Sequence, residues 1–157
     1  MPGAIVFKPI EAKLTHDTDW ITKMSPYCVF TVGDEKIKGE VCKRGGTNPH
    51  WQDTVIVPMN FNECIVELFD QHTLLPDDNI GQFIVDLDEI EFRGNLKQWY
   101  PVFYKGKHAG ELLLDAVFTS DEADLSQGEP LPNSDGMVEP SEWEIQASKE
   151  RLSQSSV

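Results

Sequence analysis

Short runs of β-branched and aromatic residues recur along the first 118 positions and constrain the fold more than any other feature. Each run alternates apolar with polar residues or is continuously apolar, and Gly, Asn, Asp or Pro separates neighbouring runs. We expect strands over residues 4–14, 27–32, 36–42, 51–57, 63–69, 80–87, 98–104 and 110–118. No segment before Ser120 has a convincing helical period, and a parallel sheet would require crossover helices. The sequence therefore predicts an all-β fold, an eight-stranded antiparallel β-sandwich or barrel.

The composition changes after Phe118, which divides the chain into three parts. One folded domain is expected over residues 1–118. Residues 119–140 are rich in Ser, Asp, Glu, Gly and Pro, which predicts a disordered acidic linker. The tail over residues 141–157 opens with the Ser-x-x-Glu spacing of a helix capping box, so it is either a frayed end or a docking segment that forms a short helix on a partner. Its large apolar residues are Trp143, Ile145 and Leu152.

Charge and cysteine usage narrow the classes of function and the compartment. A formal net charge of -14 argues against nucleic acid as a partner and against general adhesion to anionic lipid. The three cysteines, Cys28, Cys42 and Cys64, form no Cys-x-x-Cys pair and fall in expected strands, which predicts buried, reduced thiols. No apolar run reaches membrane-spanning length and no charged leader opens the chain. We expect a soluble, cytoplasmic protein.

Common catalytic motifs are absent from the sequence. It contains no Gly-x-Ser-x-Gly elbow, no phosphate loop with its lysine and no His-Glu-x-x-His. The four histidines are scattered along the chain. The sequence therefore predicts a protein that is not an enzyme.

Three local motifs occur in an informative order: Ser25-Pro26-Tyr27, Thr47-Asn48-Pro49-His50-Trp51, and Leu68-Phe69-Asp70 with Gly81 eleven residues after the aspartate. Together with Trp99-Tyr100 and the closing residues 110–114, they resemble the C2 domain, a calcium- and phospholipid-binding β-sandwich family. The resemblance covers residues 4–118 and implies an eight-stranded sandwich with the type II strand order. Within the family it is similar to the domain of the Toll-interacting protein.

The resemblance implies a calcium site built from five carboxylates on two loops. By position, the first loop offers Asp19 and then Ser25 in place of an aspartate. The second loop offers Asp70, then His72 in place of an aspartate, then Asp78. Calcium takes six to eight oxygen ligands, so this set predicts a weak or vestigial site and no required cofactor. Asp17, Asp77 and backbone carbonyls could complete a single weak site.

Apolar residues lie near the tips of both loops: Trp20 and Ile21 in the first, Leu74 and Leu75 in the second. If these side chains are exposed, burying each in lipid or in a partner contributes about 1.5–3 kcal/mol. The alternative is that Trp20 or Leu75 folds back and caps the core.

A basic segment follows the second expected strand: Lys36, Lys38, Lys43 and Arg44. Its position in the chain matches that of the strands through which some C2 domains bind phosphoinositide headgroups. Glu35 and Glu40 dilute its charge, so a solvated strand face is the alternative.

Two functions remain open on this evidence. The first is a calcium-independent adaptor or assembly protein that binds protein partners through its loops, its sheet faces or its acidic tail. The second is a peripheral membrane protein that binds phospholipid or phosphoinositide, with weak calcium dependence. Membrane and protein contacts on different faces would combine them.

Overall fold

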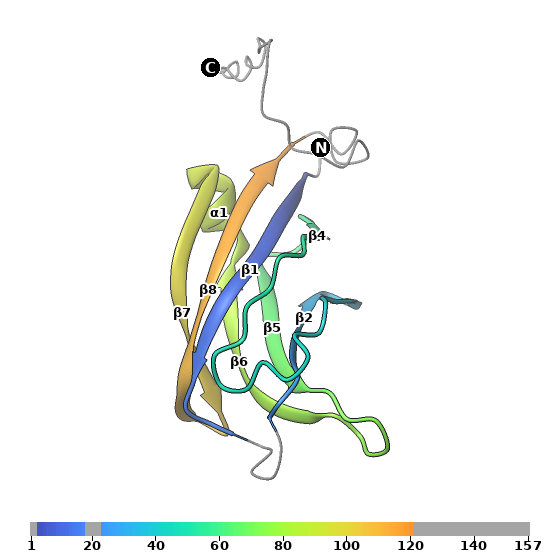
Figure 1. Ribbon diagram of the computed structural model, residues 1–157. Helices are drawn as coiled ribbons and strands as arrows, with labels where there is room; N and C mark the ends of the chain where they lie inside the picture. The colour runs from blue at the N-terminus through green and yellow to red at the C-terminus, as the bar shows by residue number, and fades with distance from the viewer. Residues whose placement is uncertain (1–2, 18–22, 121–157) are drawn as a thin grey trace. The chain divides into compact units, whose positions relative to one another are not determined.

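The computed structural model describes residues 3–17 and 23–120, which form eight strands and one helix (Figure 1). The strands are β1 (Ala4–Leu14), β2 (Pro26–Val32), β3 (Glu35–Lys38), β4 (Val55–Pro58), β5 (Glu63–Asp70), β6 (Asp78–Asp86), β7 (Asn95–Tyr104) and β8 (Lys107–Thr119). The helix α1 (Leu87–Arg93) connects β6 to β7.

All strand pairs are antiparallel, in the order β3-β2-β5-β6-β7-β8-β1-β4. The sheet folds back on itself between β6 and β7. The pairing between these two strands is limited to Gln82 and Phe103. As a result β4, β1, β8 and β7 form one layer and β3, β2, β5 and β6 the other (Figure 1). The first strand, β1, pairs with the last, β8. The predicted eight-stranded antiparallel β-sandwich is confirmed.

The core lies between the two layers and is filled by the inward-facing residues of each strand. In β5 the alternation is regular, since Cys64, Val66 and Leu68 are buried while Glu63 and Ile65 are exposed. Across the layers, the rings of Phe7 and Phe30 stack with their centroids 5.1 Å apart. The period-two pattern of the sequence therefore marks the core correctly.

The helix α1 contradicts the expectation of no helix before Ser120. Its N-cap is Asp86, whose Oδ1 accepts hydrogen bonds from the backbone N–H groups of Asp88 (3.0 Å) and Glu89 (3.3 Å). Gly94, with φ of 86°, ends it. With seven residues the helix is too short to show a period, but an Asp-x-x-Glu start signal was present at Asp86 and Glu89.

Two expected strands are shorter than predicted. The strand expected over residues 36–42 ends at Lys38, and the one expected over 51–57 begins at Val55. Between them the chain crosses to the other layer and runs beside β1: Leu14 N–H donates to Thr47 O (2.8 Å), Ala12 N–H to Pro49 O (3.1 Å) and Trp51 N–H to Ile10 O (3.0 Å). Because Pro49 has no N–H to donate, this pairing does not extend into a regular ladder.

All three cysteines are free, and two of them are buried. Burial raises the pKa of Cys64 to about 12 and also raises the pKa of Cys28. Cys42 departs from the prediction because it is only partly buried and lies outside any strand, where β3 has already ended. Within the described part of the chain, no helix is long and apolar enough to cross a membrane.

Candidate functional site

The three sequence motifs meet at the start of β2. The buried indole Nε1–H of Trp51 donates to the backbone oxygen of Pro26 (3.1 Å). The backbone N–H of Ser25 donates to Oδ1 of Asp70 (2.8 Å). Residues far apart in the sequence thus fix the position of the β5–β6 loop, residues 71–77, against β2.

Asp70 is the last residue of β5 and is buried, with 1% of its surface exposed. Among the residues that the structure describes, it is the only charged side chain buried to this extent. A buried carboxylate is destabilising unless hydrogen bonds or opposite charge compensate it. The Ser25 N–H supplies one such bond to Oδ1, and Oδ2 lies 3.8 Å from Nε2 of His72.

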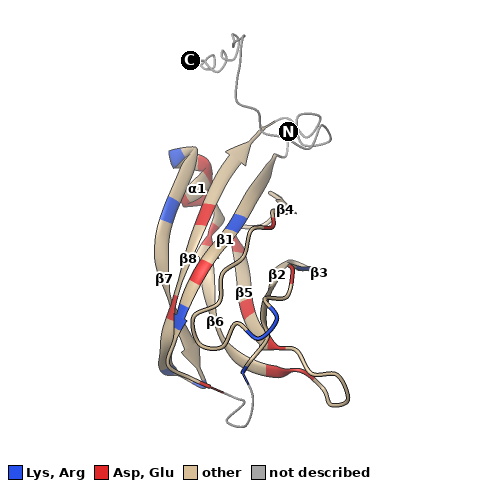
Figure 2. Ribbon diagram, viewed as in Figure 1, with Lys and Arg blue, Asp and Glu red and all other residues tan. Residues whose placement is uncertain are grey.

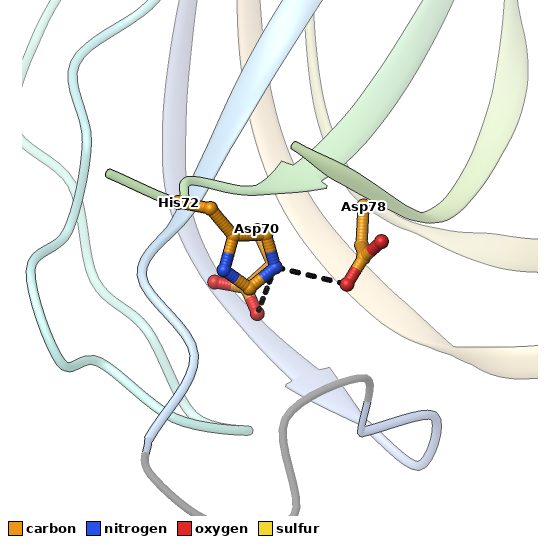
Figure 3. Close-up of side chains that lie close together, drawn as sticks. All are labelled: Asp70, His72 and Asp78. Atoms are coloured by element: carbon orange, nitrogen blue, oxygen red, sulfur yellow. Dashed lines mark hydrogen bonds and ion pairs between the residues drawn. The ribbon is translucent and has the colours of Figure 1, made fainter. Parts of the chain in front are cut away.

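His72 lies between the two carboxylates of the predicted calcium loop (Figure 3). Its Nε2 is 2.9 Å from Oδ2 of Asp78, the first residue of β6. Asp70 and Asp78 are paired across β5 and β6, so the strand register brings their side chains together. Among the described residues, Asp70, His72 and Asp78 are grouped so that they could hold a metal ion, with one ligand atom of each within 4.8 Å of the others.

The described part of this cluster does not fit a calcium ion. Calcium requires six to eight oxygen ligands, whereas the cluster supplies two carboxylates and an imidazole nitrogen. Ser25 supplies a hydroxyl in place of a carboxylate, and its Oγ accepts the backbone N–H of Arg44 (3.0 Å). The third predicted ligand, Asp19, lies outside the described residues.

Asp77, considered above as a supplementary calcium ligand, serves the loop instead. Its Oδ1 accepts the backbone N–H of His72 (2.9 Å), and its Oδ2 accepts the hydroxyl of Tyr27. These two bonds hold the pKa of Asp77 below its ordinary value, the His72 bond having the larger effect. Burial, together with the bond to Asp77, raises the pKa of Tyr27. Sequence reasoning missed this contact, since no local signal links residues 50 positions apart.

Replacing Tyr27 with phenylalanine should lower the free energy of unfolding by about 1–2 kcal/mol near neutral pH, because Asp77 loses a charge-assisted hydrogen bond. A depressed carboxyl pKa contributes stability above the pKa of the unfolded chain, about 3.9, and that contribution is lost as the pH falls through the folded value. The difference between the variant and the wild type should therefore shrink as the pH falls below the pKa of the unfolded chain.

Urea unfolding followed at several pH values measures this difference. Tyr104→Phe is the control, since the Tyr104 ring packs against His16 and its hydroxyl makes no described contact with Asp77. An equal loss of stability at neutral and acidic pH in Tyr27→Phe would contradict the assigned role of the hydroxyl.

The apolar tip of the β5–β6 loop is exposed. Leu74 and Leu75 have 93% and 69% of their surface exposed, and the loop extends beyond the ends of its two strands (Figure 1). The alternative in which Leu75 caps the core is therefore wrong. Trp20 and Ile21, the tip residues predicted for the first loop, lie outside the described residues.

The four predicted headgroup-binding cations do not share one strand face. Lys36 and Lys38 are exposed on β3, and Nζ of Lys38 lies 4.4 Å from the centroid of the Tyr27 ring. Lys43 and Arg44 belong to a turn after β3, where the Arg44 backbone bonds Ser25. Figure 2 shows the basic residues of this turn beside β2, near the acidic residues at the base of the β5–β6 loop. Headgroup binding stays a prediction. So does docking by Trp143, Ile145 and Leu152, which lie outside the described residues.

Comparison with known proteins gives a consistent family assignment. The family model described as the C2 domain matches residues 3–102. Elicitor-responsive protein 3 of Oryza sativa subsp. japonica is 28% identical over 123 residues, which cover 76% of this chain and 85% of that protein. The 16 kDa phloem protein 2 of Arabidopsis thaliana is 27% identical over 123 residues, which cover 76% and 84% of the two chains.

A solved structure agrees in fold. A C2 domain of plant extended synaptotagmin 1 superimposes with a TM-score of 0.65, at 14% identity, over 76% of this chain and 95% of that one. The likeness to the domain of the Toll-interacting protein stays a prediction. The matched family model, the sandwich with its type II strand order and the converging motifs lead to one conclusion: the chain belongs to the C2 domain family.

Proposed function

We propose that this C2 domain is a non-catalytic adaptor or assembly module that binds protein partners without calcium. The observation that carries the proposal is the position of His72, whose Nε2 lies between the carboxylates of Asp70 and Asp78. A calcium ion there would have to displace the imidazole and find several further oxygen ligands. In this proposal the imidazole, hydrogen-bonded to Asp78, takes the place of a ligand oxygen, and the loop keeps its shape without calcium.

The partner-binding surface in this proposal is the tip of the β5–β6 loop. Leu74 and Leu75 are exposed there, and burying each against a partner contributes about 1.5–3 kcal/mol. The base of the loop is fixed by the bonds of Asp70 and Asp77, so little additional order has to be imposed on binding. The surface that complements this tip is an apolar pocket on the partner.

The alternative is a peripheral membrane protein that binds phospholipid or phosphoinositide. It is favoured by the near-complete exposure of Leu74 and by the exposed lysines Lys36 and Lys38 on β3. The net charge of -14 opposes it, because anionic lipid repels an acidic chain outside any local basic patch. Either role is compatible with a cytoplasmic or membrane-peripheral protein, and the acidic tail is proposed as a second docking segment.

Sedimentation with lipid vesicles separates the two functions. The full chain is mixed with phosphatidylcholine vesicles that contain phosphatidylserine, with or without phosphatidylinositol bisphosphate, in calcium and in chelator. The proposal expects no pelleting in any mixture. Calcium-dependent pelleting that Asp70→Asn abolishes would overturn it, and calcium-independent pelleting lost in Lys36→Glu/Lys38→Glu would establish headgroup binding instead.

Affinity capture from an extract of the native source tests the protein-binding role. A defined set of proteins should be retained equally in calcium and in chelator, and Leu74→Asp/Leu75→Asp should release it. The matched control is Phe92→Asp, which alters a side chain with 92% exposure on α1, at the opposite end of the strands (Figure 1). Equal retention by both variants would contradict a role for the loop tip.

A further inference from the structure

We propose that Asp70, His72 and Asp78 bind a divalent transition metal ion of the zinc class at the position where other C2 domains bind calcium. The three ligand atoms lie within 4.8 Å of one another and come from the two ends of the β5–β6 loop (Figure 3). This inference goes beyond the proposed function, because it concerns a ligand of the isolated chain and does not depend on any partner.

The spacing of the ligand atoms suits tetrahedral zinc. Zinc binds histidine nitrogen and carboxylate oxygen at about 2.0–2.2 Å, so two ligands of a tetrahedral ion lie about 3.3 Å apart. Nε2 of His72 is 2.9 Å from Oδ2 of Asp78 and 3.8 Å from Oδ2 of Asp70, and these distances bracket that value. An ion that replaces the hydrogen bond between His72 and Asp78 would draw the two carboxylates, whose oxygens lie within 4.8 Å of each other, towards the imidazole.

The donor set also selects this class of metal. Imidazole suits zinc, copper, nickel and iron, whereas calcium and magnesium take oxygen ligands. Two carboxylates carry a charge of about −2, which a divalent ion neutralises when the imidazole is neutral. For Asp70, which is 1% exposed, such neutralisation compensates the burial of its charge.

Neighbouring groups already orient the ligands. The Ser25 N–H holds Oδ1 of Asp70 at 2.8 Å, which leaves Oδ2 directed at His72. The backbone N–H of His72 is fixed by Asp77, and the β5–β6 register places Asp78 opposite Asp70. Outer hydrogen bonds of this kind are a regular feature of metal sites in proteins.

Among the residues that the structure describes, the site is open on one side. The side chain of Asp78 is 51% exposed and that of His72 is 22% exposed, which gives an ion a path from solvent and leaves room for water as a fourth ligand. Because the ligands come from both ends of the loop, a bound ion would tie residues 71–77 together below Leu74 and Leu75.

Calorimetric titration of the full, chelator-treated and reduced chain with zinc chloride tests the proposal. We expect one ion per chain. His72→Gln should weaken binding by at least about tenfold, and Asp78→Asn, which alters an exposed side chain and should leave the fold intact, should do the same. The matched control His108→Gln removes an exposed histidine outside the cluster and should leave the affinity unchanged.

Cobalt(II) substitution identifies the ligands. The cobalt-loaded chain should show the visible bands of tetrahedral nitrogen and oxygen coordination without a thiolate charge-transfer band, and Cys42→Ser should not alter the spectrum. Absence of stoichiometric zinc binding, equal affinities in His72→Gln and His108→Gln, or a thiolate band lost in Cys42→Ser would each overturn the proposal. None of these outcomes bears on calcium-independent partner binding, so the two proposals fail separately.

Discussion

Replacing Phe30 with alanine should lower the free energy of unfolding by about 3–5 kcal/mol. The Phe30 side chain is fully buried in β2, and its ring stacks on Phe7 of the opposite layer with centroids 5.1 Å apart. Truncating the ring removes buried apolar surface and leaves a cavity where the two layers touch. The strands on both sides keep that cavity from closing. The effect is among the largest expected for a single substitution in this domain.

Equilibrium unfolding in urea, followed by intrinsic fluorescence, measures the loss. Phe92→Ala is the matched control, because Phe92 on α1 is 92% exposed and its truncation should change stability by less than about 0.5 kcal/mol. Similar losses in the two variants would contradict the placement of the core between the layers.

Replacing Gly110 with alanine should cost at least about 2 kcal/mol. Gly110 pairs with Leu14 where β8 leaves the β7–β8 turn, and its φ of 135° is a conformation that L side chains rarely adopt. A Cβ atom would also lie 2.3 Å from the backbone oxygen of Lys13. Because that atom belongs to the backbone of β1, relief of the overlap requires the strands to separate.

Gly106→Ala separates strain from steric overlap. Gly106 has φ of 81°, but a Cβ atom there would meet nothing within 4 Å. This control should therefore cost only the conformational part, about 1 kcal/mol. If thermal or urea unfolding gives equal losses for the two alanine variants, the close approach of β1 and β8 at Gly110 is not a determinant of stability.

The sequence predicts the sandwich well because strand periodicity is a local property. Alternation in segments such as residues 63–69 reports directly which side chains face the core. One error arises where a tertiary contact overrides local preference, because the segment around Pro49 is bound along β1 and does not begin β4 early. The other is α1, a seven-residue helix with a local start signal at its Asp86 cap but too short to show a helical period.

The candidate site is predictable only in part. The family resemblance brings Asp70, His72 and Asp78 together, and the strand register confirms their proximity. Neither the Asp77 bond to Tyr27 nor the burial of Asp70 follows from the sequence, because both depend on how β2 docks on β5. The sequence does not predict the exposure of Leu75 either, since an apolar residue in a loop can face either the solvent or the core.

Calorimetric titration of the zinc-free chain with calcium, beside His72→Asp, tests the central claim most directly. His72→Asp replaces the imidazole with the oxygen ligand that the family pattern has at this position, so three carboxylates would meet among the described residues. We expect no saturable heat from the wild type up to about 1 mM calcium and a measurable binding isotherm from the variant. Stoichiometric calcium binding by the wild type in the micromolar range, unchanged in His72→Asp, would contradict the claim that His72 makes this C2 domain independent of calcium.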